Sequence, residues 1–161
     1  CRDKFGDARI EVEVMVPQGS NSGVYVMGEY EIQVLDSFGR EKMGSGYKAL
    51  LYYIGFEIGI SSYKVVRGMV RDLSHTIMLY QEMFKHMGLG TLKIDISEEG
   101  NKAKVWDSFE CELFKGSSEC EGQFIRGMLA GFISSIFNKQ MYAQEIACIA
   151  KGDSHCEYVI H

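Results

Sequence analysis

Residues 121–161 read EGQFIRGMLAGFISSIFNKQMYAQEIACIAKGDSHCEYVIH, and this stretch decides the fold class. From Glu121 to Asn138, apolar side chains recur at helical spacing and form a broad apolar face, which predicts a deeply buried helix. Residues 141–150 and 155–160 then read as a closing pair of strands. Gly127 and Gly131 lie one turn apart and would let another backbone approach the helix closely.

Toward the N-terminus, the same periodicity arguments predict four further elements. They are helices over 47–60 and 69–87, a strand over 92–96 and a longer strand over 103–114. Strands linked by hairpins and packed with helices favour an α+β fold with an antiparallel sheet over a doubly wound one. In the strand over 103–114, Phe109 and Cys111 would share one face, and Trp106, Ser108 and Glu110 the other.

The first 44 residues have a different character from the rest. Residues 9–16 alternate between apolar and polar side chains, as in a half-buried strand, and 24–27 and 30–35 read as two more short strands. Loops at 36–39 and 44–46 place a boundary there. We therefore expect two parts, a short β segment over 1–44 and an α+β domain over 45–161.

Composition excludes several classes of protein. The chain has 161 residues and a formal net charge of -5, and its basic residues form no long run, so direct nucleic-acid binding is not expected. It has no apolar run long enough to span a membrane. An odd number of cysteines, five, does not read as a disulfide framework, so we expect reduced thiols and a cytoplasmic protein.

The clearest chemical pattern is Glu145-x-x-Cys148-x7-Cys156, with Cys120 upstream. Thiolates and a carboxylate are good tetrahedral zinc ligands, so these four residues are the predicted metal site. In a flat strand, Glu145 and Cys148 would point to opposite faces, so a shared ion needs a bulge, strong twist or a strand end. Two alternatives stay open: buried cysteines that act as small hydrophobes, and a cysteine–histidine nucleophile. His155 should face away from Cys156.

The single tryptophan, Trp106, is the candidate ligand-binding residue. Next to a hydroxyl and a carboxylate, it could line a pocket for an apolar molecule with one polar group. The alternative is that Trp106 packs under a helix.

Several motifs, in the right order, resemble the vinyl-4-reductase domain family over about 115 residues. This resemblance implies a dimeric α+β domain, related to a subunit of vesicle-tethering complexes, that binds a small hydrophobic molecule and acts in transcription regulation. It also implies zinc held by Glu145, Cys148, Cys156 and an earlier cysteine, expected where this chain has Gly122. The motifs are Gly46-Tyr-Lys-Ala-Leu-Leu-Tyr-Tyr-Ile-Gly-Phe-Glu-Ile-Gly59, Trp106-x-Ser-x-Glu110, Gly127-Met-Leu-Ala-Gly131 and Glu145-x-x-Cys148-x3-Gly152-Asp-x-x-Cys156.

Residues 1–44 resemble another family, jelly-roll hydrolases of keto-disaccharides. The motifs are Lys4-Phe-Gly-Asp7, Glu11-Val-Glu-Val-Met-Val-Pro17, Asn21-Ser-Gly-Val-Tyr25 and Tyr30-Glu-Ile-Gln-Val-Leu-Asp36. This resemblance implies polar site residues at Glu31, Gln33 and Asp36. A jelly roll needs about eight strands, and three cannot close its core, so activity is not expected. The chain reads as a mosaic.

Three functions follow, and the sequence favours the first. The first is a sensor module for a small hydrophobic molecule with a structural zinc site and no catalytic residue. The second is a carbohydrate-active hydrolase represented by its N-terminal strands. The third is a homodimeric interaction module that uses Gly127 and Gly131 for contact.

Overall fold

A computed structural model of the chain describes residues 21–26, 30–35, 45–97 and 100–161. The chain divides into two compact units, Cys1–Gly44 and Ser45–His161. In the first unit, β1 (Asn21–Val26) pairs antiparallel with β2 (Tyr30–Leu35), which confirms the two short strands predicted there. The strand predicted over 9–16 lies outside the described residues.

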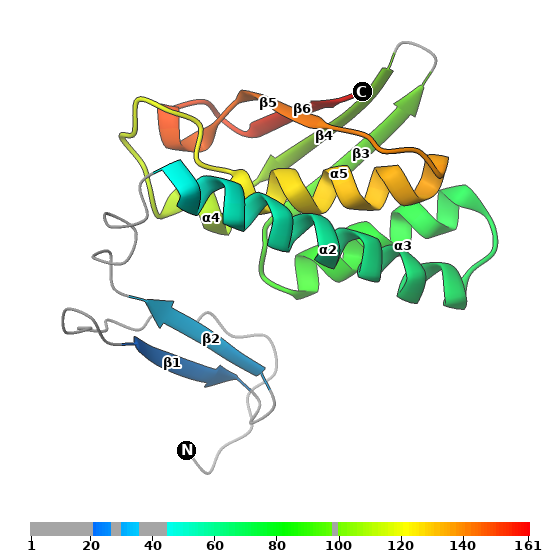
Figure 1. Cartoon of the computed structure of the whole chain (residues 1–161), viewed down its shortest axis with the longest axis horizontal. Coiled ribbons are helices and arrows are strands. Elements are labelled where there is room, and N and C mark those ends of the chain that lie inside the picture. The colour runs from blue at the N-terminus through cyan, green and yellow to red at the C-terminus, as the bar shows by residue number, and fades with distance from the viewer. Residues whose placement is uncertain (1–20, 27–29, 36–44, 98–99) are drawn as a thin grey trace. The chain divides into compact units, whose positions relative to one another are not determined.

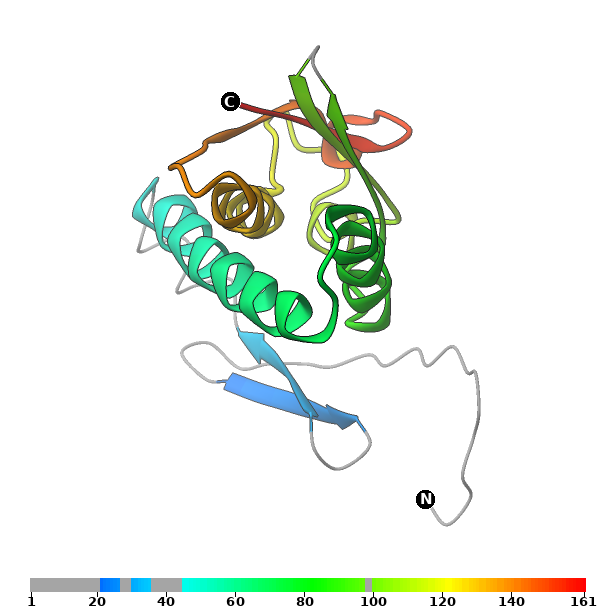
Figure 2. The ribbon, with the colours of Figure 1, turned by 90° about the vertical axis from the view of Figure 1, so that its right-hand side faces the viewer.

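The larger unit is an α+β domain, as predicted. Four strands form an antiparallel sheet in the order β3-β4-β6-β5, and the long helices cover one face of it (Figures 1 and 2). Its elements, in chain order, are α2 (Ser45–Met69), α3 (Leu73–His86), β3 (Thr91–Ser97), β4 (Gly100–Trp106), α4 (Phe109–Glu112), α5 (Gln123–Phe137), β5 (Ala143–Ala147), the 3-10 helix η1 (Ile149–Lys151) and β6 (Cys156–Ile160).

Helix α5 is the centre of the domain, because it contacts β5 and β6 on one side and α2 on the other. Most of its side chains are buried, as the broad apolar face predicts. The contact with α2 depends on glycines of both helices. A Cβ at Gly127 or Gly131 would overlap the carbonyl oxygens of Tyr52 and Phe56, and glycines of α2 lie equally close to the α5 backbone. The predicted close approach of another backbone is confirmed, and that backbone belongs to the same chain.

Helix α3 packs against the edge strand β3. Asp72 caps the helix, since its carboxylate accepts the N–H of His75 at 2.9 Å. Farther along, the Gln81 side chain accepts the N–H of Ile94 at 2.7 Å, so a helix side chain satisfies a backbone donor of the edge strand. The predicted helix over 69–87 is confirmed in kind but begins later, because α2 continues to Met69 rather than ending near residue 60.

The strand predicted over 103–114 is wrong in its second half. Strand β4 ends at Trp106, and Asp107 has a φ of 52°, which turns the chain out of the sheet. Ser108 then caps the short helix α4 by accepting the N–H of Cys111 at 3.4 Å. Glu110 and Cys111 are therefore both buried, instead of lying on opposite faces of a strand.

None of the helices described is both long and apolar enough to cross a membrane.

Candidate metal centre

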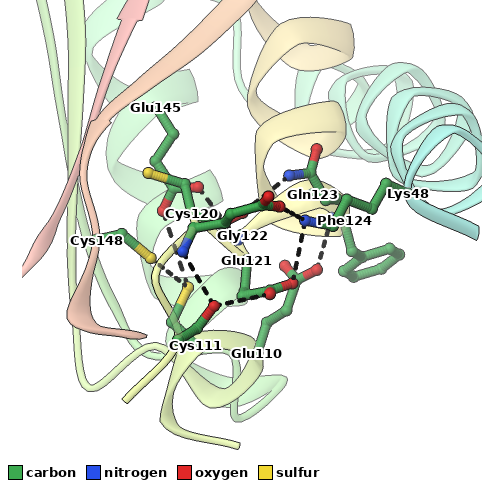
Figure 3. Close-up of polar contacts among 12 residues, drawn as sticks. Lys48, Glu110, Cys111, Cys120, Glu121, Gly122, Gln123, Phe124, Glu145 and Cys148 are labelled. Carbon is green, nitrogen blue, oxygen red and sulfur yellow. Dashed lines mark hydrogen bonds and ion pairs between the residues drawn. The ribbon is translucent and has the colours of Figure 1, made fainter. Parts of the chain in front are cut away.

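Four side chains converge at one end of the sheet: Cys111, Glu145, Cys148 and Cys156, called here the donor group. Each offers one ligand atom, and the four atoms all lie within 4.8 Å of one another. The Cys148 and Cys111 sulfur atoms are 3.6 Å apart, and Cys111 Sγ is 3.9 Å from Glu145 Oε1 (Figure 3). All three cysteines are fully buried, and all three are free thiols.

The hairpin that joins β5 to β6 positions three of the four residues. The pairing of β5 with β6 shifts register between Glu145 and Ala147, which is one of the irregularities that a shared ion was expected to require. Cys148 follows the strand, and its backbone N–H donates to Asp153 Oδ2 at 2.8 Å. Cys156 opens β6, and its sulfur accepts the N–H of Ile149 at 3.4 Å.

Cys111 completes the group, and the sequence did not point to it. It comes from α4, which the turn at Asp107 brings to the end of the β5–β6 hairpin. A signal was present, since Ser108 followed by Glu110 and Glu112 is a helix N-terminus with acidic residues in its first turn. The apparent alternation of large side chains masked that signal.

Cys120, the predicted fourth ligand, lies in the segment before α5 and is not one of the four. It is close to the group, because Glu145 and Cys148 both influence the pKa of its thiol, which burial raises. Gly122 is closer still: its N–H donates to Glu145 Oε2 at 3.1 Å, and a Cβ there would lie 2.9 Å from Oε1. Position 122, where the family resemblance places a thiol, is therefore beside the centre, while Cys111 brings a sulfur from a different element.

The geometry of the donor group fits a tetrahedral zinc ion. With Zn–S near 2.3 Å and Zn–O near 2.1 Å, two sulfur ligands should lie about 3.8 Å apart, and a sulfur and an oxygen about 3.6 Å. The separations of 3.6 Å for Cys111–Cys148 and 3.9 Å for Cys111–Glu145 are close to these values. Three sulfurs and one carboxylate oxygen are also a suitable donor set for zinc.

The electrostatics of the group favour a bound cation. Burial raises the pKa of the Cys148 thiol to about 12 and raises the pKa of Glu145. The hydrogen bond to Cys156, together with burial, raises the pKa of Cys111, and the same bond lowers the pKa of Cys156. Several acidic groups thus share one buried site, and full ionisation there requires compensating positive charge, which a divalent ion supplies.

Glu110 connects this centre to α5. The Glu110 carboxylate accepts the N–H of Phe124 at 2.8 Å and that of Ile125 at 3.0 Å, so it caps the first turn of α5 (Figure 3). Burial raises the pKa of Glu110 to about 7, against the opposite effect of these N–H donors. Adjacent residues of α4 therefore contact two different elements: Glu110 the helix, and Cys111 the donor group.

Trp106 lies apart from the helices. Its neighbour Val105 is fully buried, so the alternation of β4 places Trp106 on the opposite face of the sheet. There its ring stacks on that of His155, with centroids 5.5 Å apart. His155 accordingly faces away from the donor group, as predicted. A ligand contact for Trp106 stays a prediction, and it would have to be made from the outer face of the sheet.

Two protein families match the chain. Residues 101–161 match the vinyl-4-reductase domain, and residues 1–120 match the 3-keto-alpha-glucoside-1,2-lyase-like domain. Both resemblances drawn from the sequence are confirmed. Within the second match, however, residues 45–120 contain helices α2, α3 and α4 as well as a β-hairpin, whereas a jelly roll is built of strands.

Two uncharacterized proteins of Methanocaldococcus jannaschii are similar in sequence. One is 25% identical over 118 residues, covering 73% of this chain and 66% of the relative. The other is 26% identical over 121 residues, covering 75% and 68%. The chain thus spans about two thirds of the length of these relatives.

Three solved structures share the fold. The phenol-responsive sensory domain of the transcription activator PoxR, crystallised with phenol, has a TM-score of 0.66 at 16% identity, covering 86% of this chain and 83% of that domain. A vinyl-4-reductase family protein from Methanocaldococcus jannaschii has 0.54 at 24%, covering 69% and 66%. A trafficking protein particle complex subunit 3 from Naegleria fowleri, covalently bound to palmitic acid, has 0.53 at 12%, covering 73% and 80%.

Proposed function

Because the chain belongs to the vinyl-4-reductase domain family in residues 101–161 and to the 3-keto-alpha-glucoside-1,2-lyase-like domain family in residues 1–120, we propose that its larger unit is a zinc-holding sensor for small hydrophobic molecules. The observation that carries this proposal is the donor group. It supplies four protein ligands at tetrahedral spacing.

The zinc ion of this proposal is structural. Four protein ligands leave no open position for water or substrate, so the ion stabilises the fold without doing chemistry. Cys111 belongs to α4, Glu145 to β5 and Cys156 to β6. One ion would therefore fasten the α4 turn to the closing hairpin, and through Glu110 it would hold the start of α5 in place.

The sensor part of the proposal is supported by two proteins of the same fold. The PoxR domain was crystallised with phenol, and the Naegleria subunit carries palmitic acid, so this architecture accommodates apolar ligands. The core of the present domain is rich in aromatic and aliphatic side chains from α2, α3 and α5. A ligand acts as a signal only if it binds two conformations with different affinity. We propose that ordering of the helices around the ligand supplies that difference.

The proposal is tested on the purified full chain by two measurements. Elemental analysis should find about one zinc ion per chain, and a strong chelator should lower the midpoint of thermal unfolding. A panel of small aromatic and aliphatic compounds should contain members that raise that midpoint. A metal-free protein with unchanged stability in chelator would end the zinc proposal, and a panel with no stabilising member would end the sensor proposal.

A second function is favoured by one observation, the match of residues 1–120 to the lyase-like family. Glu31 and Gln33 lie on β2, while Asp36 lies outside the described residues. Turnover of a 3-keto-disaccharide by the chain, lost on Glu31→Gln, would establish this activity.

A third function, the dimeric interaction module, needs correction in one respect. Gly127 and Gly131 contact the backbone of α2 within the chain, so they do not form the dimer contact that the sequence suggested. A homodimer itself stays a prediction.

A further inference from the structure

Tyr80 is a fully buried residue whose hydroxyl has no hydrogen-bond partner in the part of the chain that the structure describes. It lies on the inward face of α3, between Thr76 and Phe84. Thr76, on the same face, satisfies its own hydroxyl by donating to the Asp72 carbonyl at 2.7 Å. A buried hydroxyl without a partner destabilises a fold, and phenylalanine would fill the same space without that cost. Packing alone therefore does not explain the choice of tyrosine.

The rings around Tyr80 form an aromatic cluster, defined here as Tyr63, Tyr80, Phe84 and Phe132. Two of its contacts have the edge-to-face geometry that aromatic pairs prefer: Tyr80–Phe84 with centroids 6.4 Å apart, and Tyr63–Phe132 at 5.7 Å. The third differs, because Tyr80 and Phe132 stack face to face at 3.6 Å with only 8° between their planes. That separation is shorter than the roughly 4.5–7 Å that aromatic pairs usually adopt.

The cluster also joins the moving parts of a sensor. Tyr63 belongs to α2, Tyr80 and Phe84 to α3, and Phe132 to α5. A flat molecule placed between Tyr80 and Phe132 would stack on both rings and separate α3 from α5. The cluster contains no charged side chain, so an ionised ligand would lack a counter-charge there, whereas a neutral one would not need it.

From these observations we propose that Tyr80 is the hydrogen-bonding residue of the sensor's ligand site, which accepts a flat, neutral molecule between the rings of Tyr80 and Phe132. The molecule carries one hydrogen-bonding oxygen, and this oxygen bonds to Tyr80 Oη. The inference rests on the proposed sensor function and adds to it the chemical class of the ligand and the residue that selects it.

The test compares two probes that differ by one hydroxyl, 2-naphthol and naphthalene, by equilibrium dialysis against the full chain. The wild-type protein should bind 2-naphthol more tightly. In Tyr80→Phe this preference should fall by about 3- to 10-fold, the effect of one net hydrogen bond. Tyr63→Phe is the matched control, because it removes a hydroxyl from the same cluster at a half-buried position, and it should keep the wild-type preference.

The outcomes separate the two proposals. If both probes bind and Tyr80→Phe retains the full preference for 2-naphthol, Tyr80 is not the selecting residue, although the sensor function stands. If Tyr63→Phe loses the preference as well, the effect belongs to the cluster and the assignment to Tyr80 fails. If neither probe binds the wild-type chain, the sensor function fails and the inference with it. The same variants should unfold at or above the wild-type midpoint, since Tyr80→Phe removes only an unpaired hydroxyl.

Discussion

The sulfur atoms of Cys111 and Cys148 lie 3.6 Å apart although 37 positions separate the two residues in the chain. This contact brings the short helix α4 to the turn between β5 and β6. Two thiolates that share a zinc ion have nearly this separation. The pair thus gives the most direct test of whether the donor group is a metal site.

Serine substitution should distinguish Cys111 from Cys120. Cys111→Ser and Cys156→Ser should each reduce the zinc content from about one ion per chain to near zero and lower the unfolding midpoint by roughly 5–10 °C. Cys120→Ser, the matched control, should keep both values. Elemental analysis and calorimetry measure the two effects. Loss of zinc in Cys120→Ser but not in Cys111→Ser would restore the ligand set that the sequence predicted.

The contact between α2 and α5 should not tolerate a methyl group. Gly127→Ala would push a Cβ into the Tyr52 carbonyl, so we expect a loss of about 1–3 kcal/mol in the free energy of unfolding. Gly68→Ala is the control, because a Cβ at Gly68 in α2 meets no atom within 4 Å. It should instead gain about 0.5–1 kcal/mol from helix propensity. Urea denaturation measures both, and equal effects would contradict the close backbone contact.

Glu110 should give the domain a pH-dependent stability. Burial raises its pKa from an ordinary 4.5 to about 7, so the folded state holds a proton that the unfolded state loses. The stabilisation is complete below pH 4.5 and is lost as the pH rises to about 7, with a total of roughly 3 kcal/mol. Glu110→Gln should remove this slope from the difference between the two proteins. Parallel curves for wild type and variant across that range would refute the raised pKa.

The Asp72 cap should act in the opposite direction. Hydrogen bonds, first that from the His75 N–H, lower the pKa of Asp72 from its ordinary 3.8. Its stabilisation of α3 is therefore present above that value and is lost as the pH falls below it. Asp72→Ala should lower the unfolding midpoint at neutral pH and have less effect in acid, whereas Asp72→Asn should keep most of the cap. An alanine variant as stable as wild type at neutral pH would show that the cap contributes nothing.

Periodicity was sufficient to predict α5, β3 and the closing strands, because each buries one regular face. It also raised the right difficulty at Glu145 and Cys148, which the register shift at Glu145 and Ala147 bears on. Periodicity failed over residues 107–114, where large side chains alternate by chance while Asp107 turns the chain at positive φ. That single error placed Cys111 on a strand and kept it out of the predicted metal site.

The choice between two thiols could not be made from spacing. Cys120 is nearer in sequence to the expected ligand position, and only the path of α4 brings Cys111 into the donor group. The end of α2 was equally hidden, since its last turns contain β-branched residues such as Val65 and Val66. Val66 is almost completely buried, so tertiary packing sustains a helix that local preference would have ended earlier.

The glycine contact between α2 and α5 also bears on how the domain is assembled. Gly59 meets the backbone of Met128, and α3, β3, β4 and α4 all lie between these positions in the chain. Neither helix can find its partner until that long intervening loop has closed, and closure of such loops slows folding. Each helix can form by itself within about a microsecond. The rate of folding is therefore governed by the meeting of these two backbones rather than by the speed at which either helix winds.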